Sequence, residues 1–218
     1  MEKQLISLNH LGVEVTRRCN ITCSFCLRGY LQAKDIELHH IDELLDKVGH
    51  INHFCPTGGE PSLNVEAIEY FLEGCKKRNI TIDSFYIATN GLNLSQKFIN
   101  ICDKLYEYCN KKGGVQISND VYHLEEGKYN DELLIDKPYY TKRYKENYKY
   151  DDGQLLIHDE GLSEGWDNAT RVSHESYGVL YLNVNGDVIK GCDWSYKNQE
   201  QHKLCSVEEL ENYIAIFK

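Results

Sequence analysis

The sequence lacks a long hydrophobic run, a hydrophobic segment at its start and any long stretch of basic residues. No apolar run approaches the roughly 20 residues that a membrane-spanning helix needs, so we expect no membrane partner. The residues from Met1 to Gln4 show no hydrophobic targeting region, which predicts a cytoplasmic protein. The formal net charge of −10 disfavours non-specific binding to nucleic acid, but it leaves a small RNA or nucleoside substrate open.

Internal repeats and low-complexity tracts are also absent, and 218 residues suit one domain with a short appendage. Nine cysteines without a signal peptide suit a reducing cytosol. Their odd number argues against a complete set of disulfides.

Three cysteines stand close together as Cys19, Cys23 and Cys26, in a C-x3-C-x2-C spacing. Iron–sulfur clusters take cysteine thiolates, and three of them leave one iron of a four-iron cube open for chemistry. A structural zinc site would normally take four protein ligands, and the nearest further candidates, His39 and His40, lie more than a dozen residues on. The triad therefore favours a [4Fe-4S] cluster, with zinc or chance as alternatives.

Two further runs follow the triad. A Gly-Gly-Glu-Pro run occupies residues 58–61, and a Thr-Asn-Gly run ends an apolar stretch at residues 89–91. In this order and spacing, the three motifs resemble those of the radical S-adenosylmethionine (radical SAM) superfamily. The resemblance extends from about Leu11 to the tail. It implies a partial, open (β/α)6 barrel.

The resemblance also implies an activity. The three thiolates would hold the [4Fe-4S] cluster, whose open iron is chelated by the amino and carboxylate groups of SAM. An electron from a flavodoxin- or ferredoxin-like donor would cleave SAM to methionine and a 5′-deoxyadenosyl radical, which takes a hydrogen atom from the substrate. The protein supplies position and the exclusion of water.

Residues 58–61 would form a cradle for SAM. Gly58 and Gly59 have no Cβ, so their backbone can approach a ligand closely and bond its ammonium group. Pro61 stiffens the exit from the turn. We interpret Glu60 as an organiser of the site. Alone, the run would equally suit an ordinary turn from strand to helix.

Other SAM contacts are expected at Thr89 and Asn90 and, through the resemblance, at Phe25 near the adenine. Phe25 could instead simply pack. Ser118 and Asp120 could bond the ribose hydroxyls, because family members often place polar groups there.

Alternating strands and helices predict an α/β fold with a parallel sheet. Ligand groups gather at the carboxyl ends of such strands, so we expect the motifs to meet on one face. Strands are expected near residues 11–16, 51–54, 82–88, 114–118, 155–158 and 179–184, and helices near 41–48, 65–75 and 98–109.

The segment 121–153 is rich in Tyr and Lys. It suits a long solvated helix that covers the barrel wall, or else a surface that recognises an extended substrate. His123, near its start, is a candidate catalytic residue or a packing residue. The acidic loop at 159–165 either contacts SAM or substrate or is solvated, and the sequence does not decide between these.

The tail begins with a strand, an Asn-Gly turn and a second strand, which is the signal of a hairpin. Ser206 and Glu209 form a capping-box pattern that predicts a final helix. We therefore divide the chain into a barrel core at 1–178 and a short extension at 179–218. The extension is similar to the start of SPASM or twitch domains, which bind auxiliary clusters. Its cysteines, Cys192 and Cys205, are too few for such a cluster.

Cys192 is a candidate hydrogen-atom donor or substrate-gripping thiol, with a structural cysteine as the alternative. The SPASM-like tail favours a peptide or protein side chain as substrate. A small barrel with a short tail equally resembles enzymes that act on nucleosides or other small metabolites. A non-catalytic iron–sulfur or zinc module is a third reading, against which the Gly-Gly-Glu-Pro run argues.

Overall fold

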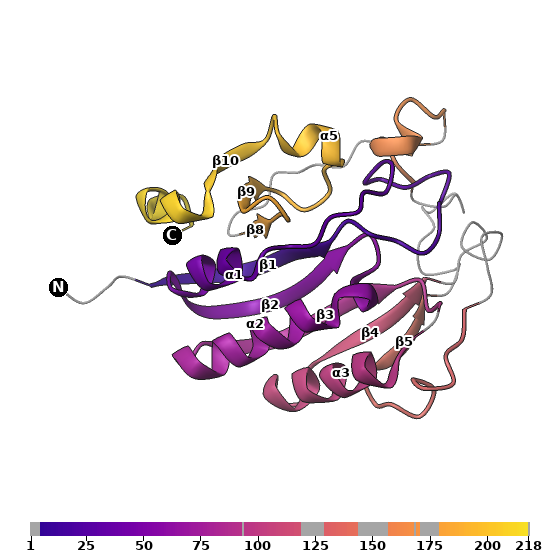
Figure 1. Cartoon of the computed structure of the whole chain (residues 1–218), viewed down its shortest axis with the longest axis horizontal. Helices are drawn as coiled ribbons and strands as arrows, with labels where there is room; N and C mark the ends of the chain where they lie inside the picture. The colour runs from indigo at the N-terminus through magenta and orange to yellow at the C-terminus, as the bar shows by residue number, and fades with distance from the viewer. Residues whose placement is uncertain are drawn as a thin grey trace.

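A sheet of eight strands forms the centre of the computed structural model, in the order β10-β9-β8-β1-β2-β3-β4-β5 (Figure 1). The structure describes residues 5–92, 94–118, 129–143, 157–167, 169–170 and 179–217. The strands of the sheet are β1 (Ile6–Thr16), β2 (Val48–Gly58), β3 (Thr81–Thr89), β4 (Gly113–Ser118), β5 (Tyr140–Arg143), β8 (Val179–Leu182), β9 (Asp187–Lys190) and β10 (Lys203–Ser206).

Neighbouring strands from β8 through to β5 are all parallel, whereas β9 and β10 are antiparallel. Helices follow the first three strands, as a parallel sheet requires. The mostly parallel α/β fold predicted from the sequence is therefore confirmed. The helices are α1 (Leu38–Leu45), α2 (Val65–Arg78), α3 (Gln96–Tyr108) and α5 (Tyr196–Gln199), with 3-10 helices η1 (Pro61–Asn64), η3 (Gly161–Ser163) and η4 (Val207–Phe217). Within the described ranges, no helix combines the length and apolarity needed to cross a membrane.

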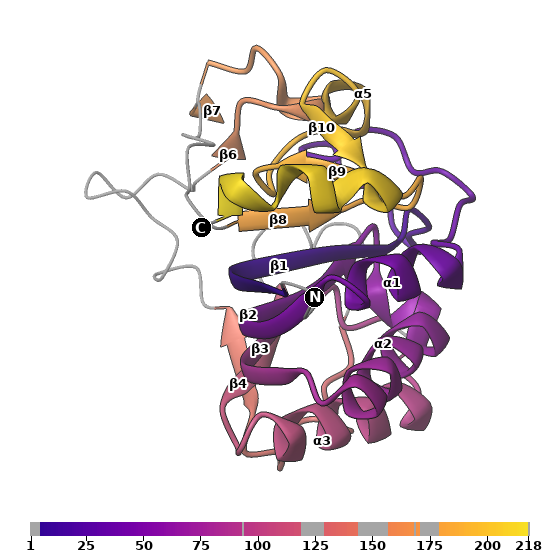
Figure 2. The same cartoon turned by 90° about the vertical axis from the view of Figure 1, so that its left-hand side faces the viewer.

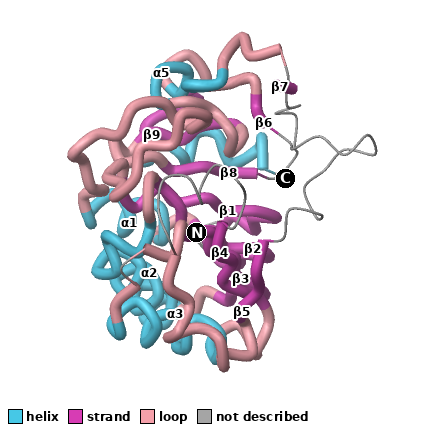
Figure 3. Tube along the Cα trace, turned by 90° about the vertical axis from the view of Figure 1, so that its right-hand side faces the viewer, coloured by secondary structure: helices cyan, strands magenta, loops and turns pink. Residues whose placement is uncertain are grey.

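The two faces of the sheet differ in character. Figures 2 and 3 show α1, α2 and α3 together on one face. Leu11, Phe54 and Phe85 are fully buried in the core that includes these helices, and Phe54 stacks on Phe71 of α2 at 4.2 Å between ring centroids. Burial of this apolar face is the main source of the fold's stability.

The opposite face is polar. The half-buried side chains of His10, His53 and Ser84 lie side by side on β1, β2 and β3, with 2.8 Å between His53 Nδ1 and Ser84 Oγ. Tyr86 donates a hydrogen bond to Gln116 at 2.6 Å. Residues next to each other in a strand point to opposite faces, so these five side chains form what we call the polar face.

Two predicted elements differ in the structure. The strand expected at 155–158 is described only as β6 (Ile157–His158), which pairs with β7 (Ala169–Thr170) in a separate small sheet. The strand that pairs with β4 at the edge of the main sheet is instead β5, inside the segment interpreted as a helix. The many Tyr residues of that segment, which we expected to cover the barrel wall from a helix, also favour a strand.

The tail joins the main sheet. The predicted hairpin is present as β8 and β9, and β8 pairs in parallel with β1. The helix predicted after Ser206 is the 3-10 helix η4, and the backbone N–H and the hydroxyl of Ser206 both contact the Glu209 carboxylate, at 3.4 and 3.2 Å. The division of the chain at residue 178 into a core and an extension stays a prediction. Strand β8 lies just after this boundary and belongs to the same sheet as the core strands.

A buried carboxylate ties the tail to β1. Glu14 has no exposed surface and accepts hydrogen bonds from Arg17 Nε at 3.0 Å, the Tyr181 hydroxyl at 3.2 Å, the Val184 backbone at 3.1 Å and Gln199 Nε2 at 3.3 Å. Arg17 also donates to Gln199 Oε1 at 2.7 Å. Hydrogen bonds from several partners offset the cost of burying this ion pair.

We expect Glu14→Gln to lower the free energy of unfolding by about 3–5 kcal/mol, because it leaves the buried Arg17 charge without its counter-ion. Urea denaturation followed by circular dichroism measures this. Glu66→Gln, which breaks an exposed pair with Lys97, should leave the midpoint nearly unchanged. Equal midpoints for the two variants would contradict the importance of the buried pair.

Candidate functional site

The cysteine triad lies on the loop that follows β1. Cys19, Cys23 and Cys26 are half-buried, and the Cys26 N–H donates to the Cys23 carbonyl at 3.2 Å. Three cysteines on one loop at the carboxyl end of a parallel strand are a donor set that a [4Fe-4S] cluster can take. The residues present therefore fit the expected cluster.

The two glycines of residues 58–61 bring the end of β2 against this loop. The Gly59 and Glu60 N–H groups donate to the carbonyls of Thr16 and Arg18, at 2.9 and 2.8 Å. A Cβ on Gly58 would lie 2.0 Å from the Thr16 oxygen, and one on Gly59 would lie 2.3 Å from the Arg18 oxygen. The glycines thus permit a close approach of two backbone segments, whereas the sequence predicts only their close approach to a bound ligand.

Glu60 connects the end of β2 to the end of β3. Its buried carboxylate accepts hydrogen bonds from the Ser62 N–H at 3.0 Å, the Thr89 hydroxyl at 2.8 Å and the Asn90 N–H at 2.8 Å. Burial raises the pKa of Glu60, while these donors act in the opposite direction. This geometry fits the expected role of Glu60 as an organiser of the site.

Asn90 continues the connection to the triad. Its Nδ2 donates to Asn20 Oδ1 at 2.7 Å and lies 3.8 Å from Cys19 Sγ. Burial raises the pKa of the Cys19 thiol, and the Glu60 charge adds to the effect. Because a cluster binds the thiolate, its binding must release this proton.

The structure describes only some of the remaining candidate site residues. Ser118 is buried at the end of β4, and Pro61 is the first residue of η1. Phe25 is half-buried in the triad loop. Asp120 and His123 lie outside the described residues. The structure brings the triad together with residues 58–61 and 89–90, and contact of all these residues with SAM stays a prediction.

The acidic loop that the sequence left undecided supports the triad loop. The Leu162 N–H donates to the Cys26 carbonyl at 2.9 Å. The buried Glu160 carboxylate accepts from the Ser195 N–H and from Asn198 Nδ2, both at 2.8 Å. Glu160 thus links the loop to α5. Neither this role nor that of Glu14 was predicted, because a single acidic residue in a sequence gives no sign of its distant partners.

Cys192 lies beside the polar face. Its Sγ is 3.6 Å from the position that a Cβ on Gly12 would take. Burial raises the pKa of Cys192 to about 12, with a further contribution from Asp193 and an opposing one from Arg28. Burial also raises the pKa of Cys55 to about 12. At neutral pH Cys192 is a thiol and carries a hydrogen atom, and its catalytic role stays a prediction.

Comparisons with known proteins give the context of this site. A family model described as the Radical SAM superfamily matches residues 13–147. An uncharacterized protein of Methanocaldococcus jannaschii is 28% identical over 129 residues, which cover 56% of this chain and 44% of that protein. The GTP 3′,8-cyclase of Clostridium acetobutylicum is 36% identical over 103 residues, which cover 44% of this chain and 31% of the cyclase. The chain thus spans less than half the length of these relatives.

The fold is similar to that of a solved structure described as native anSMEcpe with bound AdoMet and Cp18Cys peptide. The two share 15% sequence identity with a TM-score of 0.52, and the match covers 97% of this chain and 80% of that one.

We expect Glu60→Gln to weaken SAM binding about tenfold or more while the iron content is retained. The amide nitrogen would face buried donors from Thr89 and Asn90, and an unsatisfied buried group costs about 1–3 kcal/mol. The change in the electron paramagnetic resonance spectrum of the reduced cluster on addition of SAM measures binding. Glu107→Gln, at an exposed position of α3, is the matched control. Unchanged binding in a folded Glu60→Gln protein would contradict the organising role.

Proposed function

Because the chain belongs to the radical SAM superfamily, whose members use a [4Fe-4S] cluster and SAM, we propose that it takes a hydrogen atom from a peptide or protein side chain. Bound together, the two cofactors would supply the radical, a 5′-deoxyadenosyl species formed by reductive cleavage of SAM. The chain's own residues would position the reactants and exclude water.

The observation that carries this proposal is the convergence of the three motifs. Glu60 binds the backbone of Asn90, and the Asn90 side chain lies next to Cys19. These residues come from three separate strand ends, so one buried carboxylate orients the proposed SAM cradle relative to the cluster loop. We propose that Cys19, Cys23 and Cys26 bind the cluster and that Glu60 orients the cradle.

The polar face supports a substrate without phosphate groups. Strands β1 to β4 contain no lysine or arginine. Burial lowers the pKa of His53, and burial together with the His53 charge lowers that of His10, so both rings are neutral near pH 7. A peptide backbone can use such neutral donors and acceptors. The likeness to anSMEcpe, whose description includes a bound peptide, supports the same substrate class.

A nucleoside or other small metabolite is the second candidate, favoured by the identity with a GTP 3′,8-cyclase. A triphosphate is usually bound by arginine or lysine. Their absence from β1 to β4 makes the peptide the better-supported substrate. A non-catalytic module is not favoured, since the chain belongs to a superfamily of enzymes. The flavodoxin- or ferredoxin-like donor and the cytoplasmic location stay proposals.

The reconstituted and dithionite-reduced protein should convert SAM to 5′-deoxyadenosine, detected by liquid chromatography under anaerobic conditions. Cys19→Ala, Cys23→Ala and Cys26→Ala should each abolish the product, because each removes a ligand of the cluster. Cys109→Ala, which removes a buried cysteine outside the site, is the matched control and should retain it. A protein with a full cluster that neither forms product nor changes its resonance spectrum with SAM would contradict radical SAM chemistry.

The substrate class can be tested by co-expression with neighbouring open reading frames, followed by mass spectrometry of their peptide products. We expect a mass change in one peptide that disappears with Cys19→Ala. In parallel, GTP and other nucleosides are supplied to the reduced enzyme. Consumption of a nucleoside without modification of any peptide would replace the first candidate with the second.

A further inference from the structure

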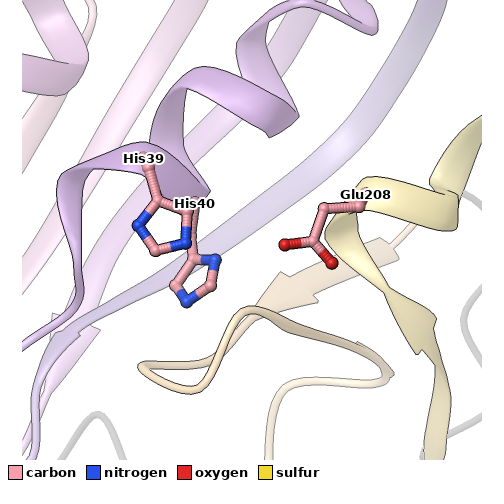
Figure 4. A group of neighbouring side chains, drawn as sticks. All are labelled: His39, His40 and Glu208. Atoms are coloured by element: carbon pink, nitrogen blue, oxygen red, sulfur yellow. The ribbon is translucent and has the colours of Figure 1, made fainter.

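Two histidines and a glutamate converge outside the site described above. His39 and His40 stand at the start of α1, and Glu208 stands at the start of η4 (Figure 4). One ligand atom from each residue lies within 4.8 Å of the others. Figure 4 shows the Glu208 carboxylate facing the two imidazole rings. Residues almost 170 positions apart in the sequence thus present three potential metal ligands to one point.

The surroundings of the two rings suit metal binding. His39 Nδ1 lies 3.4 Å from Glu37 Oε2, which leaves Nε2 for a metal. Metal-binding histidines commonly have a carboxylate beside their other ring nitrogen. His40 Nδ1 is buried without a hydrogen-bond partner. A buried nitrogen without a partner costs free energy, which a metal ion bound to that nitrogen would recover.

The fold holds the His40 ring in place. The turn between β8 and β9 packs closely against the His40 ring, because a Cβ on Gly186 would lie only 2.4 Å from the ring atoms Cε1 and Nδ1. Gly186 has a φ of +78°, and its carbonyl accepts from the Val207 N–H at 2.8 Å. This bond places Glu208, the next residue, beside the ring.

We propose that His39, His40 and Glu208 bind a zinc-type divalent ion that fastens η4 to α1. Zinc accepts imidazole nitrogen and carboxylate oxygen, and two His with one Glu plus a water complete a tetrahedral site. Magnesium prefers oxygen ligands alone and does not suit this set. The site is independent of the radical SAM chemistry proposed above.

The test uses the anaerobic protein with its [4Fe-4S] cluster in place, so that the triad thiols are occupied. Isothermal titration with Zn²⁺ should show one ion bound per chain, and the melting temperature should rise on binding. His39→Ala and Glu208→Gln should each weaken binding at least tenfold. Glu37→Gln should weaken it about 10–100-fold through its effect on the His39 ring.

Glu211→Gln, at an exposed position of the same helix η4, is the matched control and should bind zinc like the wild type. Absorbance of the cluster is followed during the titration to show that zinc does not displace iron. The proposal is overturned if the wild type binds no zinc, or if His39→Ala and Glu208→Gln bind it as tightly as the control does. Magnesium that binds as tightly as zinc would also overturn it.

Discussion

A buried carboxylate must collect hydrogen bonds from its surroundings, and the region around the cysteine loop depends on this constraint. Glu60 joins the end of β2 to the end of β3. Glu14 joins β1 to the tail, and Glu160 joins the acidic loop to α5. Each carboxylate gathers donors from distant parts of the chain. Together they fix the strand ends, the tail and α5 around the loop that carries the triad.

The unequal faces of the sheet determine where a substrate can bind. The helix-covered face is filled by side chains such as Phe54 and Phe85, which leaves it closed to a ligand. The polar face presents half-buried hydrogen-bonding groups, among them His53 and Tyr86. Cys192 lies at this face near Gly12. The proposed radical, formed at the carboxyl ends of the strands, would therefore meet its substrate at this polar face.

Two of the contacts that attach the tail to the barrel involve β8 and η4. In the first, β8 extends the parallel sheet along β1, and the Tyr181 hydroxyl of β8 donates a hydrogen bond to Glu14 of β1. In the second, η4 lies against α1, where His40 and Glu208 face each other. Anchorage of this kind gives the short extension a defined position beside the polar face, where Cys192 lies near Gly12.

The sequence by itself was enough to identify the family and the parallel α/β fold. The triad, residues 58–61 and residues 89–91 are local motifs whose chemistry depends on residue type and spacing, and the family match confirmed the family that they indicate. The regular alternation of apolar segments predicted β1 to β4 and the helices between them, since burial follows that period.

Only the tertiary structure decided the partners of buried polar groups. Glu14 bonds Tyr181, and His40 approaches Glu208, across about 170 residues of sequence. It also showed that β5 pairs with β4 at the edge of the main sheet, whereas residues 157–158 pair with β7 in a separate sheet. Such pairings depend on which strands become neighbours. The packing of the whole chain decides this, and no local hydrophobic period in the sequence encodes it.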